Sequence, residues 1–195
     1  MNGYNRHESQ LLPPIPQGAI LIDKFNELGR LSFFDQMCQK VTLLSQEMRL
    51  KMDDNGDVGI AALDYRVEEH PSGLLVLEAE IFVLQEAFTL NGVNDMDLIP
   101  ITVEHEITEA WVDLLSFFDD ESQRNHRLAN GIGHKSGVMA EYVLAHKLGL
   151  AERYLELVTR WAQEMSWQEA QVFLEENFQA YSTTHHFNGN GKNGR

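Results

Sequence analysis

The sequence is poor in cysteine, in basic residues and in long apolar runs, and each scarcity excludes a class of protein. Cys38 is the single cysteine in 195 residues, which excludes both an internal disulfide and a cysteine-rich zinc site. The chain has 15 Lys and Arg residues against 30 Asp and Glu residues, so its formal net charge is −15. Because phosphate groups would repel such a chain, we expect neither nucleic acid nor an anionic membrane as a partner.

No apolar run reaches the roughly 18 residues that a membrane span requires. The first residues also lack the apolar core of a signal peptide, so we expect a cytoplasmic protein. Hydrophobic residues make up 43% of the chain, which is enough for a sizeable core. The length predicts one domain at 19–181, between a disordered proline-rich arm at 1–18 and a disordered tail at 182–195 that is rich in glycine and asparagine.

The hydrophobic pattern predicts an α+β fold with a small antiparallel or mixed sheet at about 58–90 and a mostly helical C-terminal half. Alternating apolar and polar residues predict strands at 63–68 and 74–83, joined by a turn at 70–73. Pro100 favours an extended entry at 98–101. Apolar residues at helical spacing predict helices at 31–52, 103–118, 138–148, 151–165 and 167–181. The first of these helices would place Cys38 in the core and begin at Ser32 as its cap.

The helix predicted at 103–118 carries the clearest chemical pattern. Its apolar residues form one arc, and His105 and Glu109 lie near the middle of the opposite arc. Residues four apart are neighbours on one helix face, with about 5–6 Å between their Cβ atoms. That spacing lets one helix supply two ligands to one metal ion, and Glu106 follows where the H-E-x-x-H pattern has its general base. The same arc also fits the solvated face of a surface helix, and the sequence leaves both interpretations open.

Glu141 is the second unusual residue, because its helix carries it on an apolar face. In helical projection it lies between Leu148 and Ala145. A buried carboxylate is costly unless it is paired or bound to a metal. We therefore expect Glu141 either to pair with an Arg or Lys of another helix or to join His105 and Glu109 at a metal ion.

Residues 105–149 resemble the zincin metallopeptidases, especially their glutamate-liganded branch, which combine a His-Glu-x-x-(His or Glu) helix with a later helix that supplies a Glu. The stretch is also similar to small phage and bacterial proteins that carry His-Glu-Ile-x-Glu-Ala, then a His-containing segment and an Ala-Glu-Tyr helix ending in Leu-Gly. The resemblance implies a divalent metal held by His105, Glu109 and either Glu141 or His134. It also implies that Glu106 is the catalytic base.

The choice of third ligand decides which metal fits, because Glu109 stands where zincins usually have histidine. With Glu141 the set has one imidazole and two carboxylates, which admits manganese. With His134 it has two imidazoles and one carboxylate, which suits zinc or ferrous iron, and zinc is our expectation. His134 and Glu141 are seven residues apart, which is about 10 Å along a helix, so we do not expect one ion to take both.

The resemblance implies a hydrolase in which a water activated by the metal attacks a peptide or amide carbonyl. An edge strand at 74–83 would align the peptide substrate, and Tyr142 is the candidate for stabilising the oxyanion. The alternative is a non-enzymatic structural or interaction protein, of phage-like type, with a degenerate metal site.

Several other polar residues receive simpler interpretations. The segment 53–57 lacks the alternating ligands and distal Glu of a calcium loop and is predicted to be a turn. Asp113 is either exposed or orients a metal ligand. His126, and the pair His185 and His186 in the predicted tail, are expected to be solvated.

Overall fold

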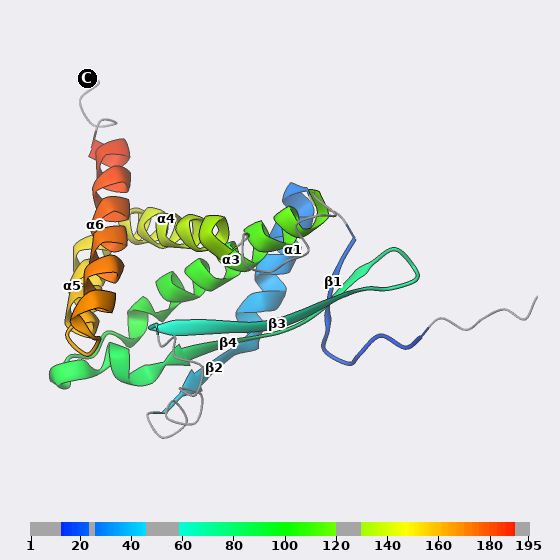
Figure 1. Cartoon of the computed structure of the whole chain (residues 1–195), viewed down its shortest axis with the longest axis horizontal. Helices are drawn as coiled ribbons and strands as arrows, with labels where there is room; N and C mark the ends of the chain where they lie inside the picture. Colours follow the sequence, from blue (N-terminus) through cyan, green and yellow to red (C-terminus); the bar gives the residue numbers. More distant parts are fainter. Residues whose placement is uncertain (1–12, 24–25, 46–58, 120–129, 190–195) are drawn as a thin grey trace, which may run out of the picture.

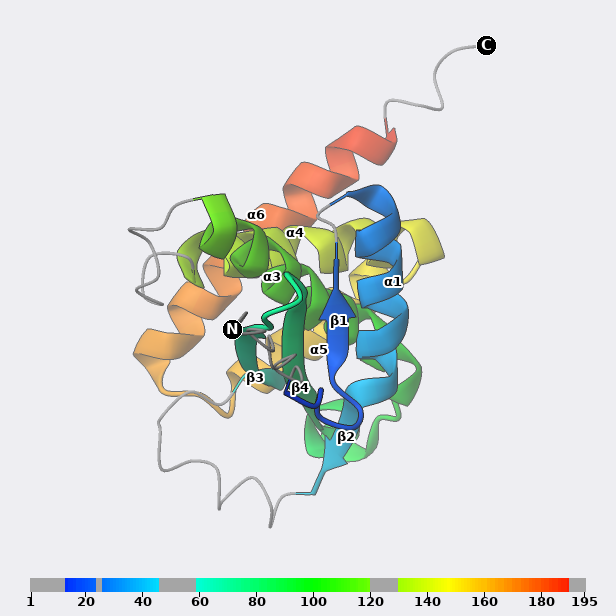
Figure 2. The same cartoon turned by 90° about the vertical axis from the view of Figure 1, so that its right-hand side faces the viewer.

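The computed structural model describes residues 13–23, 26–45, 59–119 and 130–189, and within them the chain has the predicted α+β fold. Figure 1 shows a small sheet, the long helix α3 (Ile99–Asp119) packed on it, and α4 (Asn130–Leu148) beyond α3. Two further helices, α5 (Ala151–Ala162) and α6 (Trp167–Gly189), pack side by side at one end of α4. Helix α1 (Glu27–Met37) runs beside the first strand (Figure 2).

The sheet is mixed and is built around β4 (Leu75–Leu84). Along one side β4 pairs antiparallel with β3 (Ala61–Glu69). Along its other side it pairs antiparallel with β1 (Ile20–Ile22) and then parallel with β2 (Val41–Leu44). The prediction of 74–83 as an edge strand is therefore wrong. The nearly continuous apolar composition of β4 is typical of a strand covered on both faces.

The outer edge of the sheet belongs to β3, which among the described strands pairs with β4 alone. Its residues alternate between half-buried and exposed side chains, as the sequence predicts for a strand with one covered face. The turn that joins β3 to β4 is also confirmed. There the N–H of Gly73 donates to the carbonyl oxygen of His70 over 2.8 Å, and Gly73 has a φ of +83° that favours glycine.

The start of α6 and the end of α4 agree with the prediction, because residues next to each boundary determine it. Ser166 and Glu169 form the predicted capping box at the start of α6, with reciprocal hydrogen bonds of 3.4 and 3.2 Å. Gly149 follows α4 with a φ of +72°, as predicted. Short 3-10 helices at Gln85–Phe88, Leu90–Gly92 and Met96–Leu98 lead from β4 to α3, and another at Cys38–Lys40 leads from α1 to β2.

The first helix differs from the prediction, because contacts with residues far away in the sequence determine where it ends. The predicted helix at 31–52 ends at Met37, because Val41–Leu44 pair with β4 as a strand. Its cap is Asn26, whose side chain accepts a hydrogen bond from the N–H of Gly29, and Cys38 is exposed instead of buried.

Several helices extend further than the sequence indicated, and α4 begins at Asn130 instead of 138. Residues 99–101 are helical, since a proline in the first turn of a helix sacrifices no hydrogen bond. Helix α6 continues to Gly189, past the predicted start of a disordered tail at 182, and Thr184 is buried on it. The predictions for 1–12, 53–57, His126 and 190–195 lie outside the described residues.

Helix α3 lies in the middle of the molecule, between the sheet and α4 (Figures 1 and 2). Its apolar arc packs on the sheet and α1; the Trp111 ring, for example, lies 5.3 Å from that of Phe33. Each large apolar side chain buried in this way contributes about 1.5–3 kcal/mol to folding. No helix in the described parts of the chain has the length and apolar composition needed to cross a membrane.

Two glycines allow α4 to pack closely against α3. A Cβ atom at Gly137 would lie 2.7 Å from Cδ2 of His105 and 2.9 Å from its carbonyl oxygen. A Cβ atom at Gly133, one turn earlier, would collide with the carboxylate of Asp113. At these two positions the backbone of α4 therefore lies directly against the His105 and Asp113 side chains of α3.

We expect Gly137→Ala to lower the free energy of unfolding by about 1–3 kcal/mol, because the new methyl group overpacks this contact. The matched control is Gly131→Ala in the same helix, where a Cβ atom meets nothing within 4 Å. The control should be neutral or stabilising by up to about 1 kcal/mol, as usual for Gly→Ala in a helix. Urea unfolding of both variants measures the difference, and equal stabilities would contradict the close approach of the helices.

Candidate metal centre

The polar arc of α3 is buried, which rules out the solvated-face interpretation of this helix. His105 and Glu106 are each 9% exposed, and Asp113 is 6% exposed. Helix α4 covers this arc through Gly133 and Gly137, as described above. Polar groups excluded from water need partners, so the contacts of these side chains indicate what the site is built to hold.

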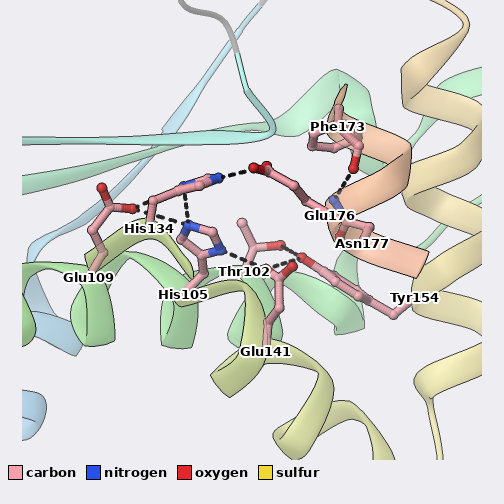
Figure 3. A network of polar contacts seen from close by, with 9 residues as sticks. All are labelled: Thr102, His105, Glu109, His134, Glu141, Tyr154, Phe173, Glu176 and Asn177. Atoms are coloured by element: carbon pink, nitrogen blue, oxygen red, sulfur yellow. Dashed lines mark hydrogen bonds and ion pairs between the residues drawn. The ribbon is translucent and has the colours of Figure 1, made fainter. Parts of the chain in front are cut away.

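Three donor atoms from α3 and α4 converge beside this arc (Figure 3). Nε2 of His105 lies 3.2 Å from Oε2 of Glu109 and 3.3 Å from Nδ1 of His134. Nδ1 of His134 lies 3.4 Å from the same Glu109 oxygen. His134 belongs to α4, before the start at 138 that the sequence predicts for this helix. His105, Glu109 and His134 are thus a group that could hold a metal ion.

Glu141 contacts the other nitrogen of His105, away from the three converging atoms. Its Oε2 lies 3.0 Å from Nδ1 of His105. The same oxygen accepts a 3.0 Å hydrogen bond from the hydroxyl of Tyr154, which is itself 3.0 Å from the hydroxyl of Thr102. The described partners of this buried carboxylate are therefore His105 and Tyr154, whereas one of the two alternatives for Glu141 required an Arg or Lys. A carboxylate on the free nitrogen fixes the orientation of a metal-binding imidazole.

Glu176 of α6 makes the equivalent contact with the second histidine. Its Oε2 lies 3.3 Å from Nε2 of His134, whose Nδ1 faces Glu109 (Figure 3). Sequence reasoning missed Glu176, since it is 42 residues from His134 and no local pattern connects the two. Each imidazole thus has one nitrogen toward the donor group and a carboxylate on the other. This pairing is common among metal-binding histidines.

The pKa values of the donor group reflect this crowding of opposite charges. Burial disfavours a charged His105, but the Glu141 and Glu109 carboxylates outweigh burial and hold its pKa well above the ordinary value. The hydrogen bond to Glu109 likewise raises the pKa of His134. Burial would raise the pKa of Glu109, yet its hydrogen bonds to His105 and His134 lower it to about 2. These shifts show that the carboxylates favour positive charge at this point, which a divalent cation would supply.

The donor group lies in the wall of a cleft of about 1130 Å³. The cleft is bordered by 59–65 at the edge strand β3 and by residues of α3, α4, α5 and α6. Glu106 also lines it, and burial raises the pKa of the Glu106 carboxyl to about 7. Within the described part of the chain, this carboxylate makes no hydrogen bond or ion pair with another side chain. Glu106 is thus a buried carboxylate beside the donor group that borders the cleft.

Tyr142 does not have the position that its predicted role requires, whereas Tyr65 borders the cleft. Tyr142 is fully buried against Tyr154 and Tyr181 and does not line the cleft, so it is not placed to stabilise an oxyanion there. Tyr65 of β3 does line the cleft, and its pKa is raised to about 12 by burial and by the Asp113 and Glu109 carboxylates. The alternation of β3 places Tyr65 on the covered face of the strand, but it could not show which helix lies opposite.

The remaining candidates are also located. Asp113 is buried and lines the cleft one helical turn from Glu109, so of its two predicted roles exposure is wrong. His185 and His186 are exposed on α6 and lie outside the donor group.

The two candidates for third ligand can be separated by affinity. We expect His134→Ala to weaken zinc binding by at least about 1000-fold, because it removes a donor atom. Glu141→Gln should weaken it by about 10- to 100-fold, because it alters only the group that orients His105. Competition with a coloured chelator measures both constants. Equal losses in the two variants would contradict the assignment of His134 as a ligand and Glu141 as its support.

Two imidazole nitrogens and one carboxylate oxygen form a set that suits zinc or ferrous iron. The supporting carboxylates Glu141 and Glu176 strengthen the fit, since they hold both rings with one nitrogen toward the common point.

Comparisons of the chain with protein-family models, with curated proteins and with solved structures find no match. The resemblance of residues 105–149 to zincins therefore stays a prediction.

Proposed function

We propose that this protein is a metal-dependent hydrolase that cleaves a peptide or amide bond. One observation carries the proposal: Nε2 of His105, Oε2 of Glu109 and Nδ1 of His134 converge in the wall of a large cleft that the buried Glu106 also lines. A metal site that only stabilises the fold would need no cleft. It would also not need the Glu106 carboxylate, which makes no hydrogen bond or ion pair with another described side chain. Zinc is the ion that we expect, with ferrous iron as the other candidate.

In this proposal one set of residues binds the metal ion and another residue transfers the proton. His105, Glu109 and His134 would hold the ion, which when bound polarises a carbonyl group and lowers the pKa of water. Glu106 accepts the proton of the attacking water and returns it to the leaving nitrogen. Its place beside the donor group and along the cleft suits both halves of that transfer. Glu141 and Glu176 keep the two imidazoles in place.

The edge strand β3 supports a peptide as the substrate. Residues 59–65 border the cleft, and β3 pairs with β4 alone among the described strands. Backbone groups along its outer edge are thus available to an extended peptide, which would add to the sheet as a further strand. This strand takes the aligning role that the sequence assigned to 74–83.

Metal analysis of the protein expressed without a histidine tag tests the proposal. We expect a stoichiometric transition metal and hydrolysis of short randomised peptides, detected by mass spectrometry. A chelator should abolish hydrolysis, and added zinc or ferrous iron should restore it.

Each failure of this experiment has a definite meaning. A protein that binds no metal at all overturns the proposal. Stoichiometric metal without hydrolysis of any peptide favours the alternative, a non-enzymatic interaction protein whose metal serves only its fold.

A further inference from the structure

The face of α6 that borders the cleft has a regular composition. Glu169, Val172, Phe173, Glu176 and Asn177 all line the cleft, and their spacing places them on one side of the helix. Two carboxylates are therefore separated by two apolar side chains. Glu164 and Met165, which precede α6, line the same region. We call Glu164, Met165, Glu169, Val172 and Phe173 the α6 subsite.

The α6 subsite begins beside the donor group. Glu176, the next carboxylate along the same helix face, lies 3.3 Å from His134. Glu169 and Phe173 lie two turns and one turn before Glu176 on that face. A substrate side chain placed over Phe173 would therefore belong to a residue close to the bond that is cleaved.

Carboxylates predominate in the cleft away from the two imidazoles of the donor group. Among the described residues that line it, carboxylates come from β3, α3, α4, α6 and the turn after α5, and none is Lys or Arg. Within the α6 subsite, Glu164 makes no described ion pair, and the Glu169 carboxylate contacts only the backbone N–H of Ser166. Both side chains are exposed, so water solvates their carboxylates, and no described cation pairs with them.

A buried acceptor also borders the cleft, next to Glu176 on α6. Asn177 is 3% exposed and lines the cleft. Its Nδ2 donates to the carbonyl oxygen of Phe173 over 2.8 Å, which fixes the orientation of the amide. Oδ1 then has no hydrogen-bond partner among the described residues. Buried acceptors of this kind are normally satisfied, and a donor group of a bound peptide would satisfy this one.

We infer that the substrate is a basic peptide, with a Lys or Arg side chain in the α6 subsite next to the scissile bond. The aliphatic stem of such a residue packs on Val172 and Phe173, and its charged end reaches the carboxylates of Glu164 and Glu169. This inference rests on the proposed function and adds its specificity. An acidic or neutral residue in the same place would leave the carboxylates unpaired or repelled.

Product analysis of randomised peptides cleaved by the wild-type protein with its metal is the first test. We expect Lys and Arg to be enriched at one fixed position beside the cleaved bond. In matched peptides, Lys at that position should give about tenfold higher kcat/KM than norleucine, which has an uncharged stem of similar length. Cleavage without such enrichment overturns the inference and leaves the proposed function intact.

The double variant Glu164→Gln/Glu169→Gln identifies the residues responsible. It should remove the advantage of Lys over norleucine while leaving the norleucine peptide unaffected. Glutamine at 169 can still form the capping box with Ser166, so α6 should be preserved. The matched control is Glu156→Gln/Glu175→Gln, which makes the same change of charge at exposed positions of α5 and α6 outside the cleft. An equal loss in variant and control overturns the assignment to the subsite.

Measuring peptide affinity tests the preference for a basic side chain independently of hydrolysis. The Glu106→Gln protein with its metal should bind the Lys peptide about tenfold more tightly than the norleucine peptide, whether or not hydrolysis occurs. Equal affinities overturn the inference. Absence of hydrolysis by the wild type together with selective binding overturns the proposed function alone.

Discussion

Replacement of Glu106 by glutamine should lower the rate of peptide hydrolysis by about 100- to 10,000-fold and leave the metal content unchanged. Glutamine has nearly the same shape as glutamate but cannot take a proton from water. The side chain is not among the three converging donors, so the ion should stay bound. Burial already raises the pKa of this carboxyl, because an ionised group is costly there. A neutral amide avoids that cost, and the melting temperature should not fall.

Glu104→Gln is the matched control for this variant. It makes the same chemical change on the same helix, two residues earlier, at a side chain that lines a different pocket. Its turnover and metal content should be those of the wild type. If Glu106→Gln keeps its turnover, Glu106 is not the base; if it loses its metal, Glu106 is a ligand and the division of roles is wrong.

Replacement of His105 by alanine should remove the metal and destabilise the protein. His105 is the central member of the donor group, with Nε2 facing Glu109 and His134 and Nδ1 bonded to Glu141. Loss of its ring leaves the Glu141 carboxylate, 4% exposed, without its charged partner. Breaking a buried ion pair from one side costs about 3–5 kcal/mol. We expect no bound metal and no rise in melting temperature when zinc is added.

A second variant keeps this prediction testable if His105→Ala fails to fold. The side chain of His134 is 44% exposed, so His134→Ala should fold normally and still lose the metal. The control is His185→Ala/His186→Ala, which removes two exposed imidazoles outside the donor group. The control should retain the stoichiometric metal of the wild type. Metal retained by both His105→Ala and His134→Ala would place the ion elsewhere.

The sequence predicts those features that depend on residues close together in the chain. Helix α3, the β3–β4 hairpin and the capping box at Ser166 follow from spacing and turn composition, and all are confirmed. His105 and Glu109 could be proposed as ligands because one helix sets their separation.

Features that depend on distant partners could not be predicted. Helical periodicity distinguishes two arcs of α3, but it cannot reveal that α4 covers the polar arc. Val41 and Leu44 fit a helix or a strand equally well, and pairing with β4 decides between them. Glu176 reaches His134 only after α6 has packed against α4.

The close contact of α4 with α3 has a consequence for which ions the protein accepts by size. His105 and Glu109 are fixed to one helix and His134 to the other, and the fit of Gly137 against the His105 ring limits how the helices shift. Zinc needs bonds of about 2.0–2.2 Å to nitrogen and oxygen, whereas calcium needs about 2.3–2.6 Å and six or more oxygens. A pair of helices held this firmly should favour the smaller cation and reject calcium, even at millimolar concentrations and despite the surplus of negative charge.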